Sequence, residues 1–135
     1  MITALDSSII LDVLSADPVH GEDSRKALKS QRRAGSLIAC EVVWSEVSAA
    51  FPDGEQAREV MSRLRIDFSP MTLPMALAAG QAWRAYRARG GSRVRVTSDF
   101  MIAAHAATAA DLLLTRDTGI ARLGMSGLRL AAPGR

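Results

Sequence analysis

Residues 98–117 read SDFMIAAHAATAADLLLTRD, and this stretch decides the fold class of the chain. Its first part, Asp99 to Ala110, is almost entirely alanine and apolar residues, which predicts a helix whose small side chains let it pack closely on a sheet. Leu112 to Thr115 then predicts a buried strand. An apolar helix followed at once by an apolar strand is typical of an α/β domain with a parallel sheet.

The rest of the chain repeats this alternation of short apolar runs and longer amphipathic runs. One helix should begin at Ser7 or Ser8, both good N-caps, and end before the Pro18–Gly21 break. Further helices are predicted over residues 22–33, 41–51, 55–65 and 74–89, and further strands over residues 2–5, 37–40, 66–68 and 128–130. No linker or repeat interrupts the pattern, so we expect a single domain over residues 1–135.

The composition is that of an ordinary globular protein. Of 135 residues, 48% are apolar and 23% are charged, which argues against a disordered chain. No stretch approaches the roughly 18 consecutive apolar residues of a membrane span, and the N-terminus lacks the basic flank of a secretory signal. The single cysteine, Cys40, excludes an intrachain disulfide, fits a reducing cytosol and is expected to be a small core residue.

The basic residues are unevenly distributed. Only Lys26 and Lys29 are lysines among the 17 basic residues, and the others are arginines, whose planar donor fork suits phosphate. A GC-rich genome also gives many arginines, so the count alone does not decide between function and composition. Position is more informative, because the dozen residues 84–95, shortly before Asp99, hold Arg84, Arg87, Arg89, Arg93 and Arg95. A cationic cluster that runs into an acidic site suggests a polyanion guided toward a metal.

Four acidic residues lie at the end, at the head or inside of apolar segments: Asp6, Glu46, Asp99 and Asp117. Asp6 and Asp117 each follow a predicted strand, and such strand ends form the crevice that binds ligands in parallel α/β sheets. Each aspartate alone also fits a helix cap or an Asx-turn, and Ser98 competes with Asp99 for the cap. Only the four together, on elements that can converge, favour a binding site.

Glu46 has the fewest simple explanations among the four. Its neighbours at three and four residues along the predicted helix, Val42, Val43, Ala49 and Ala50, are apolar or small. We therefore expect its side chain to point into the protein, where a carboxylate needs a cation or a raised pKa. The alternative is a glutamate at the margin of the apolar stripe that reaches solvent.

The types of side chain favour a hard divalent cation. Four carboxylates in a chain with one cysteine and two histidines point to Mg²⁺ or Mn²⁺ rather than zinc. His20 and His105 lack zinc spacing, and His105 is more simply a packed or hydrogen-bonded helix residue. The chain has no G-x-x-x-x-G-K-[ST], G-x-G-x-x-G or G-x-S-x-G motif. The sequence therefore gives no support to a nucleotide-binding P-loop, a dinucleotide-binding domain or an α/β-hydrolase with a nucleophile elbow.

Five segments match the motifs of one known family. They are LDSS at 5–8 with Asp12, VWSEV at 43–47, SDFMIAAHA at 98–106, LLTRD at 113–117, and GLRL at 127–130 with Pro133. Asp117 follows Asp99 by eighteen residues, as the family pattern expects. With these segments the chain resembles the PIN-domain family, specifically the VapC-like toxin ribonucleases of bacterial toxin–antitoxin pairs, over essentially its whole length.

The resemblance implies a PIN-like three-layer α/β/α sandwich with a central parallel sheet of four to five strands. It makes Asp6, Glu46, Asp99 and Asp117 the catalytic carboxylates that bind one or two Mg²⁺ or Mn²⁺ ions. These ions would activate a water for the cleavage of RNA phosphodiester bonds. The resemblance further implies a cytoplasmic toxin that forms a homodimer and binds a VapB-like antitoxin, in a heterotetramer or a larger assembly.

Further residues take their expected roles from the same resemblance. Thr115, and Ser7 as another, would support the metal-binding carboxylates with their hydroxyls. Arg93, Arg95 and Arg116 are candidates for holding RNA phosphates; contact with an acidic antitoxin tail, or simple solvation, fits them equally. The chain departs from the common family form in two places: Ser8, where asparagine is frequent, and Gly119, where many members carry a further acid. The glycine puts a fifth carboxylate, and occupancy of a second metal site, in doubt.

Two other functions compete with the ribonuclease. One is a PIN fold that binds RNA or antitoxin without cutting, and the other is a receiver-type phosphoacceptor domain. A receiver needs a lysine after a late strand, whereas both lysines here lie in the first quarter of the chain. For a partner, the sequence offers compatible apolar side chains that build a groove or dimer face or else belong to the core: Trp44, Phe51, Val60, Met61 and Leu64.

Overall fold

The short apolar runs form one parallel sheet of five strands in the order β3-β2-β1-β4-β5. The structure is a computed structural model and describes residues 1–134. Its strands are β1 (Ile2–Leu5), β2 (Ser36–Ala39), β3 (Ile66–Phe68), β4 (Leu112–Leu114) and β5 (Leu130–Ala131). The number of strands is the upper value of the predicted range.

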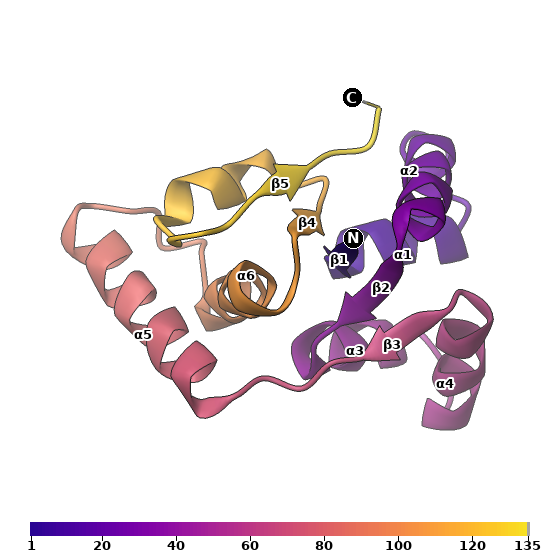
Figure 1. The fold of residues 1–135 in the computed structure, drawn as a ribbon, viewed down its shortest axis with the longest axis horizontal. Helices are drawn as coiled ribbons and strands as arrows, with labels where there is room; N and C mark the ends of the chain where they lie inside the picture. Colours follow the sequence, from indigo (N-terminus) through magenta and orange to yellow (C-terminus); the bar gives the residue numbers. More distant parts are fainter. Residues whose placement is uncertain (135) are drawn as a thin grey trace.

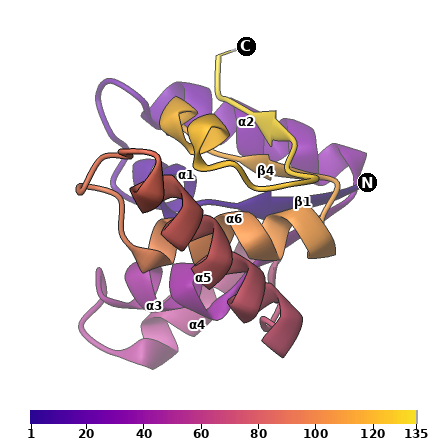
Figure 2. The ribbon, with the colours of Figure 1, turned by 90° about the vertical axis from the view of Figure 1, so that its left-hand side faces the viewer.

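Helices cover both faces of this sheet. They are α1 (Ser7–Leu14), α2 (Gly21–Ala34), α3 (Glu41–Ser48), α4 (Gly54–Arg63), α5 (Leu73–Ala88) and α6 (Thr97–Ala109), followed by the 3₁₀ helix η1 (Thr118–Leu123). Figure 1 shows α1 and α2 on one side of the sheet and α3, α5 and α6 on the other. The view from the side shows the same layers, with α5 and α6 packed against each other (Figure 2). The predicted three-layer α/β/α sandwich is confirmed.

Most predicted boundaries differ from the observed ones by at most two residues, and two of the differences have a clear cause in the backbone. Helix α3 ends at Ser48 instead of residue 51, because the next backbone amides, those of Ala50 and Phe51, donate to the third residue before them and tighten the chain into a turn. Strand β5 begins at Leu130 instead of residue 128, since Gly127 adopts a positive φ of 80° and turns the chain before the strand pairs with β4.

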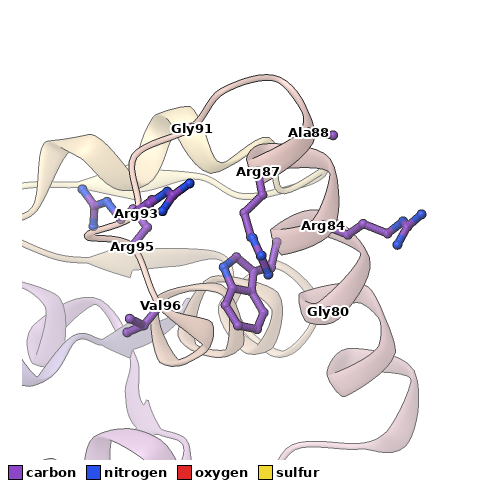
Figure 3. A pocket seen from close by; sticks show the side chains of 9 residues that line it. Gly80, Arg84, Arg87, Ala88, Gly91, Arg93, Arg95 and Val96 are labelled. Atoms are coloured by element: carbon purple, nitrogen blue, oxygen red, sulfur yellow. The ribbon is translucent and has the colours of Figure 1, made fainter.

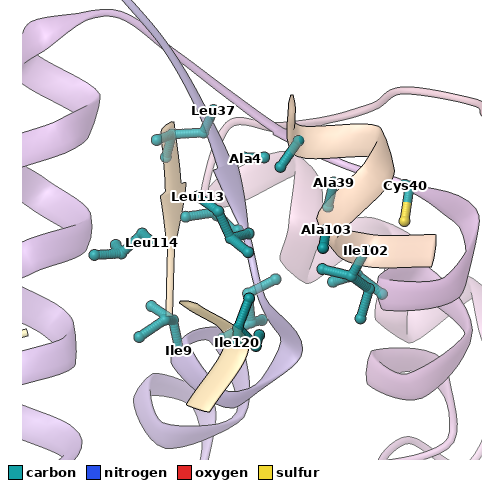
Figure 4. Close-up of a cluster of buried hydrophobic side chains, with 14 of the residues drawn as sticks. Ala4, Ile9, Leu37, Ala39, Cys40, Ile102, Ala103, Leu113, Leu114 and Ile120 are labelled. Carbon is teal, nitrogen blue, oxygen red and sulfur yellow. The ribbon is translucent and has the colours of Figure 1, made fainter. Parts of the chain in front are cut away.

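The core explains why the central strands are apolar on both faces. Ala4 and Leu5 of β1 and Leu113 and Leu114 of β4 are buried beneath helices on both sides. Figure 4 shows strand side chains packed together with those of α6, whose run of small residues lets the helix lie close to the sheet. Cys40 is buried in this core, as predicted.

The sheet topology brings the ends of β1 and β4 together. Leu5 is paired with Leu114, and the backbone amide of Asp6 donates to the Leu114 carbonyl at 3.1 Å. The chain leaves β1 toward β2 on one side, while β4 lies on the other side of β1. The carboxyl edge between β1 and β4 is therefore the switch point at which ligands bind in open α/β sheets.

The apolar residues suggested for a groove or dimer face mostly belong to the interior. Met61 is fully buried, and Trp44, Phe51 and Leu64 are half-buried against the core. The large apolar side chains that are exposed near them are instead Phe68, Leu73 and Leu77. Across residues 1–134, none of the helices combines the length and apolar character that crossing a membrane requires.

Candidate functional site

Asp6 lies at the carboxyl end of β1 and is held there by hydroxyl groups. It is 9% exposed, and its Oδ2 accepts hydrogen bonds from Thr115 Oγ1 at 2.6 Å and from Ser8 Oγ at 3.4 Å. Burial raises the pKa of Asp6, the hydroxyls oppose that rise, and the charge of Asp117 adds to it. Ser8 therefore supplies a hydrogen bond to this carboxylate, as an asparagine in its place would.

Asp117 lies after β4, where it begins η1. Its Oδ1 accepts from the Gly119 amide at 3.0 Å, and its own amide donates to Thr115 Oγ1 at 3.0 Å. The hydroxyl of Thr115, which is 1% exposed, thus joins Asp6 to Asp117. This is the supporting position expected for Thr115.

Arg95 reaches into the site and pairs with Asp117. Its guanidinium donates with both terminal nitrogens to the two carboxylate oxygens, one of them at 2.8 Å, and lowers the pKa of Asp117. Gly119 makes room for this pair, because a Cβ there would collide with the Arg95 guanidinium. Arg95, for which we expected contact with RNA phosphate, contact with an acidic antitoxin tail or simple solvation, instead binds one of the predicted metal ligands.

Glu46 differs from its prediction. It lies on α3 and is exposed, while the buried stripe of this helix is formed by Val43 and Val47. The expectation that its side chain points into the protein is therefore wrong. Its carboxylate nevertheless turns toward the site, where Oε1 accepts from Ser7 Oγ at 3.2 Å. Ser7 thus supports a carboxylate, as expected.

The four acids share one electrostatic environment. Desolvation raises the pKa of Glu46 most, Ser7 opposes it, and the charges of Asp6 and Asp99 raise it further. Asp99 occupies the first turn of α6, where its Oδ2 accepts from the Val96 amide at 3.2 Å and lies 4.0 Å from Arg95 Nη1. The structure therefore brings all four predicted acids to one edge of the sheet.

These residues fit a divalent cation by their chemistry. All the donors are carboxylate oxygens, which suit Mg²⁺ or Mn²⁺, and desolvation together with the charges of neighbouring acids raises the pKa of Asp6 and Glu46. As they stand, no three or more His, Cys, Asp or Glu side chains within residues 1–134 are grouped to hold a metal ion. Arg95 binds both oxygens of Asp117, so this guanidinium competes with any cation that uses Asp117.

Arg116, a second expected phosphate ligand, has a partner inside the protein. Its Nε and Nη2 donate to Asp12 at 2.9 and 3.0 Å, and Ser24 Oγ donates to the same carboxylate at 2.9 Å. Asp12 is buried on α1 and Ser24 on α2, so Arg116 ties the loop after β4 to both helices. Sequence reasoning missed this pair because its partners lie 104 residues apart, although Asp12 is part of the first family motif.

The other predicted residues are placed as follows. His105 is 1% exposed and its Nε2 lies 2.9 Å from Ser69 Oγ, so it is the packed, hydrogen-bonded helix residue that was predicted. Burial lowers its pKa. Arg93 is exposed in the loop before α6, beside the acidic site.

Comparison with known proteins agrees with this architecture. The family model described as PIN domain matches residues 3–125. No curated protein matches the sequence. Among solved structures, the chain is similar to a VapBC2 structure from Rickettsia felis, determined with a DNA fragment of the promoter, with a TM-score of 0.76 and 17% identity over 98% of this chain and 99% of that chain.

Two further solved structures show the same fold at similar distance. VapBC-1 from nontypeable Haemophilus influenzae has a TM-score of 0.72 and 18% identity over 98% of each chain. VapC20 from Mycobacterium tuberculosis, described as a sarcin–ricin loop cleaving toxin, has a TM-score of 0.66 and 13% identity over 94% of this chain and 98% of that chain.

Proposed function

The chain belongs to the PIN-domain family, and from that premise we propose that it is a Mg²⁺- or Mn²⁺-dependent endoribonuclease, the toxin of a toxin–antitoxin pair. One observation carries the proposal: Asp6, Glu46, Asp99 and Asp117 lie at the switch point of the sheet, where desolvation of the carboxylates and, less strongly, the charges of neighbouring acids raise the pKa of Asp6 and Glu46. Such repulsion destabilises the protein unless a cation joins the site.

The four carboxylates would hold the metal. A bound Mg²⁺ or Mn²⁺ supplies an activated water and neutralises charge on the scissile phosphate. No side-chain nucleophile is needed for this chemistry.

The hydroxyl groups position these carboxylates. Thr115 bonds both Asp6 and the backbone of Asp117, so it fixes the spacing of the acids that follow β1 and β4. Ser7 donates to the carboxylate of Glu46 and holds it toward the site. Because each hydroxyl contacts a carboxylate instead of open solvent, these two residues are positioning residues that act through the acids.

Partners follow from the relatives. Several similar structures are toxin–antitoxin complexes, which supports an antitoxin partner of VapB type and a homodimer within a heterotetramer or larger assembly. The exposed apolar side chains of Phe68, Leu73 and Leu77 offer a surface for such contacts. Acting on RNA, the protein would function in the cytoplasm.

The direct test replaces single acids and measures RNA cleavage. Asp6→Asn and Asp99→Asn should each abolish Mg²⁺-dependent cleavage, because each removes a charge from the site while keeping an oxygen acceptor for the local hydrogen bonds. Asp67→Asn, on the exposed part of β3 at the sheet edge, is the matched control and should cleave normally. Cleavage by Asp6→Asn at the wild-type rate refutes the proposal.

Calorimetry separates this enzyme from a PIN fold that binds RNA or antitoxin without cutting. The wild type should bind Mn²⁺, and Asp6→Asn should bind it at least about tenfold more weakly, as loss of a single carboxylate ligand predicts. A protein that takes up no Mn²⁺ but still binds RNA would be the silent module. The receiver-type alternative would instead show phosphorylation of an aspartate by a small phosphodonor.

A further inference from the structure

A cavity between α5 and the loop that leads into α6 adjoins the acidic site through Arg95. It has a volume of about 930 Å³, within the range of roughly 300–1,000 Å³ common for ligand pockets. Helix α5 supplies Gly80, Trp83, Arg84 and Arg87, and the loop that leads into α6 supplies Arg93 and Arg95. Figure 3 shows this loop facing α5, with Arg87 directed into the space between them and Arg84 extending outward.

The cavity is positively charged, and of its four arginines only Arg95 has an acidic partner in the described chain. Its lining includes four arginines and no acidic residue. Within residues 1–134, no ion pair involves Arg84, Arg87 or Arg93, whereas Arg25, Arg58 and Arg63 elsewhere on the surface each pair with a glutamate. Unpaired arginines gathered around one hollow attract an anion.

Trp83 gives the cavity a flat aromatic surface. The ring is half-buried and packs at 6.5 Å from the Phe100 ring, which fixes its orientation. The guanidinium of Arg87 lies 5.3 Å from the centre of the same ring. The planar guanidinium over the ring and the ring itself form a short stack that an unpaired base can join, whereas an acidic peptide has no group that needs such a stack.

Arg95 connects the cavity to the acids. It lines the cavity, and it also lines a smaller hollow of about 450 Å³ together with Asp99 and Asp117. A nucleotide chain whose scissile phosphate lies at the carboxylates can therefore place a neighbouring nucleotide in the cavity.

From this we infer that the cavity binds one unpaired nucleotide of the RNA next to the scissile bond, with its base against the stack of Trp83 and Arg87 and its phosphates near Arg87 and Arg93. The inference rests on the proposed ribonuclease function. It adds a nucleotide-binding position outside the acidic site, which only an unpaired base can occupy, because a base paired within a duplex cannot stack on a side chain.

Binding is tested without cleavage, using a fluorescein-labelled single-stranded RNA in EDTA and fluorescence anisotropy over a series of salt concentrations. Arg87→Gln and Arg93→Gln should each weaken binding and reduce the slope of log K against log salt by about 0.7. The control is Arg33→Gln, an exposed arginine at the end of α2, which should bind like the wild type. Equal losses in all three variants would mean diffuse surface binding and overturn the inference.

Gly80 provides a variant that does not depend on charge. An added Cβ at this helical position meets no atom within 4 Å, so Gly80→Ala and Gly80→Leu should both fold, with a gain in helix propensity. Leucine extends into the cavity and alanine does not. Gly80→Leu should therefore weaken RNA binding about 5- to 150-fold, the range for loss of one stacked base, while Gly80→Ala binds normally. Unchanged binding by Gly80→Leu overturns the inference.

Tryptophan fluorescence reports the stacking itself. Trp44→Phe leaves Trp83 as the only tryptophan and removes an indole N–H that is buried without a partner in the described structure. Single-stranded RNA should quench Trp83 to saturation. Quenching by poly-glutamate with equal affinity would assign the cavity to an acidic peptide instead.

The failure of this inference can be told apart from the failure of the proposed function. RNA binding through the cavity without any Mg²⁺-dependent cleavage would refute the proposed function alone. Cleavage that is unaffected by Gly80→Leu would refute the role of the cavity alone.

Discussion

Arg116→Ala tests whether this arginine anchors the fold or holds RNA. In the structure its guanidinium donates twice to Asp12, whose side chain is 6% exposed and has one other donor, Ser24. Removing Arg116 leaves a buried carboxylate with a single hydrogen bond. Breaking a fully buried pair costs about 3–5 kcal/mol, but the Arg116 side chain is 39% exposed, so water can replace part of it. We expect a loss of about 2–3 kcal/mol.

Substitution of the partner residue, Asp12, should lower the free energy of unfolding by less. Asp12→Asn keeps one oxygen acceptor for the guanidinium and a group that can bond Ser24, and the freed Arg116 can extend into water. We expect about 1–2 kcal/mol for this variant, a loss of two or fewer hydrogen bonds. Urea unfolding at pH 7, followed by circular dichroism, measures both values on the same scale.

The pH dependence follows from the pKa of Asp12. Burial raises this pKa, but the hydrogen bonds from Arg116 and Ser24 outweigh burial and hold it below the ordinary value. A lowered folded pKa stabilises the protein above the unfolded value of about 3.9, and this stabilisation is lost as the pH falls through the folded value. The difference between wild type and Arg116→Ala should therefore shrink below about pH 4.

The contrary result is equally clear. If Arg116→Ala unfolds at the same urea concentration as the wild type, but binds single-stranded RNA with a salt slope reduced by about 0.7, Arg116 is a phosphate ligand and the anchoring argument is wrong.

Three further outcomes are expected at the acidic site. Thr115→Val removes the hydroxyl shared by Asp6 and Asp117, so it should raise the pKa of Asp6 further and cost about 2 kcal/mol in urea unfolding, whereas Thr115→Ser should cost less. Glu46→Gln removes a carboxylate whose raised pKa means that its charge destabilises the folded state at neutral pH, so the stability of the metal-free protein should not fall. The rise in Tm on adding Mn²⁺, followed by differential scanning fluorimetry, should be smaller for this variant than for the wild type. Arg95→Ala frees Asp117 and should tighten Mn²⁺ binding about 3- to 10-fold in calorimetry, while unchanged affinity would mean that Arg95 does not compete with the metal.

The sequence predicts the fold well because its signals are local. Each strand is a short apolar run, and each helix has its own cap, break or periodicity, so only boundaries such as the start of β5 at Leu130 depend on pairing with a distant strand. The order of the family motifs likewise places Asp6, Asp99 and Asp117 at the ends of elements that a parallel sheet brings together.

The details of the site depend on distant partners and could not be predicted in this way. Glu46 has apolar neighbours in sequence, yet α3 turns Val43 and Val47 to the core and leaves Glu46 at the surface. Arg116 and Asp12 are far apart in the chain, and nothing in either segment shows that their side chains meet. Periodicity gives the position of the buried stripe of a helix only to within about one residue, so it cannot tell whether a residue at the edge of the stripe is buried. Ion pairs between two elements depend on how those elements pack.

Arg95 gives the site and the cavity a shared element. The guanidinium neutralises Asp117 and lines the arginine-rich cavity, and Gly119 leaves it the space to do so. In the proposed enzyme, a metal ion bound to Asp117 would neutralise this carboxylate in place of Arg95, and the freed guanidinium would be available to RNA in the cavity. Removing Arg95 should therefore act in opposite directions, tightening the metal and weakening the RNA. The cleavage rate alone combines these two effects, so metal affinity and RNA affinity have to be measured separately for this residue.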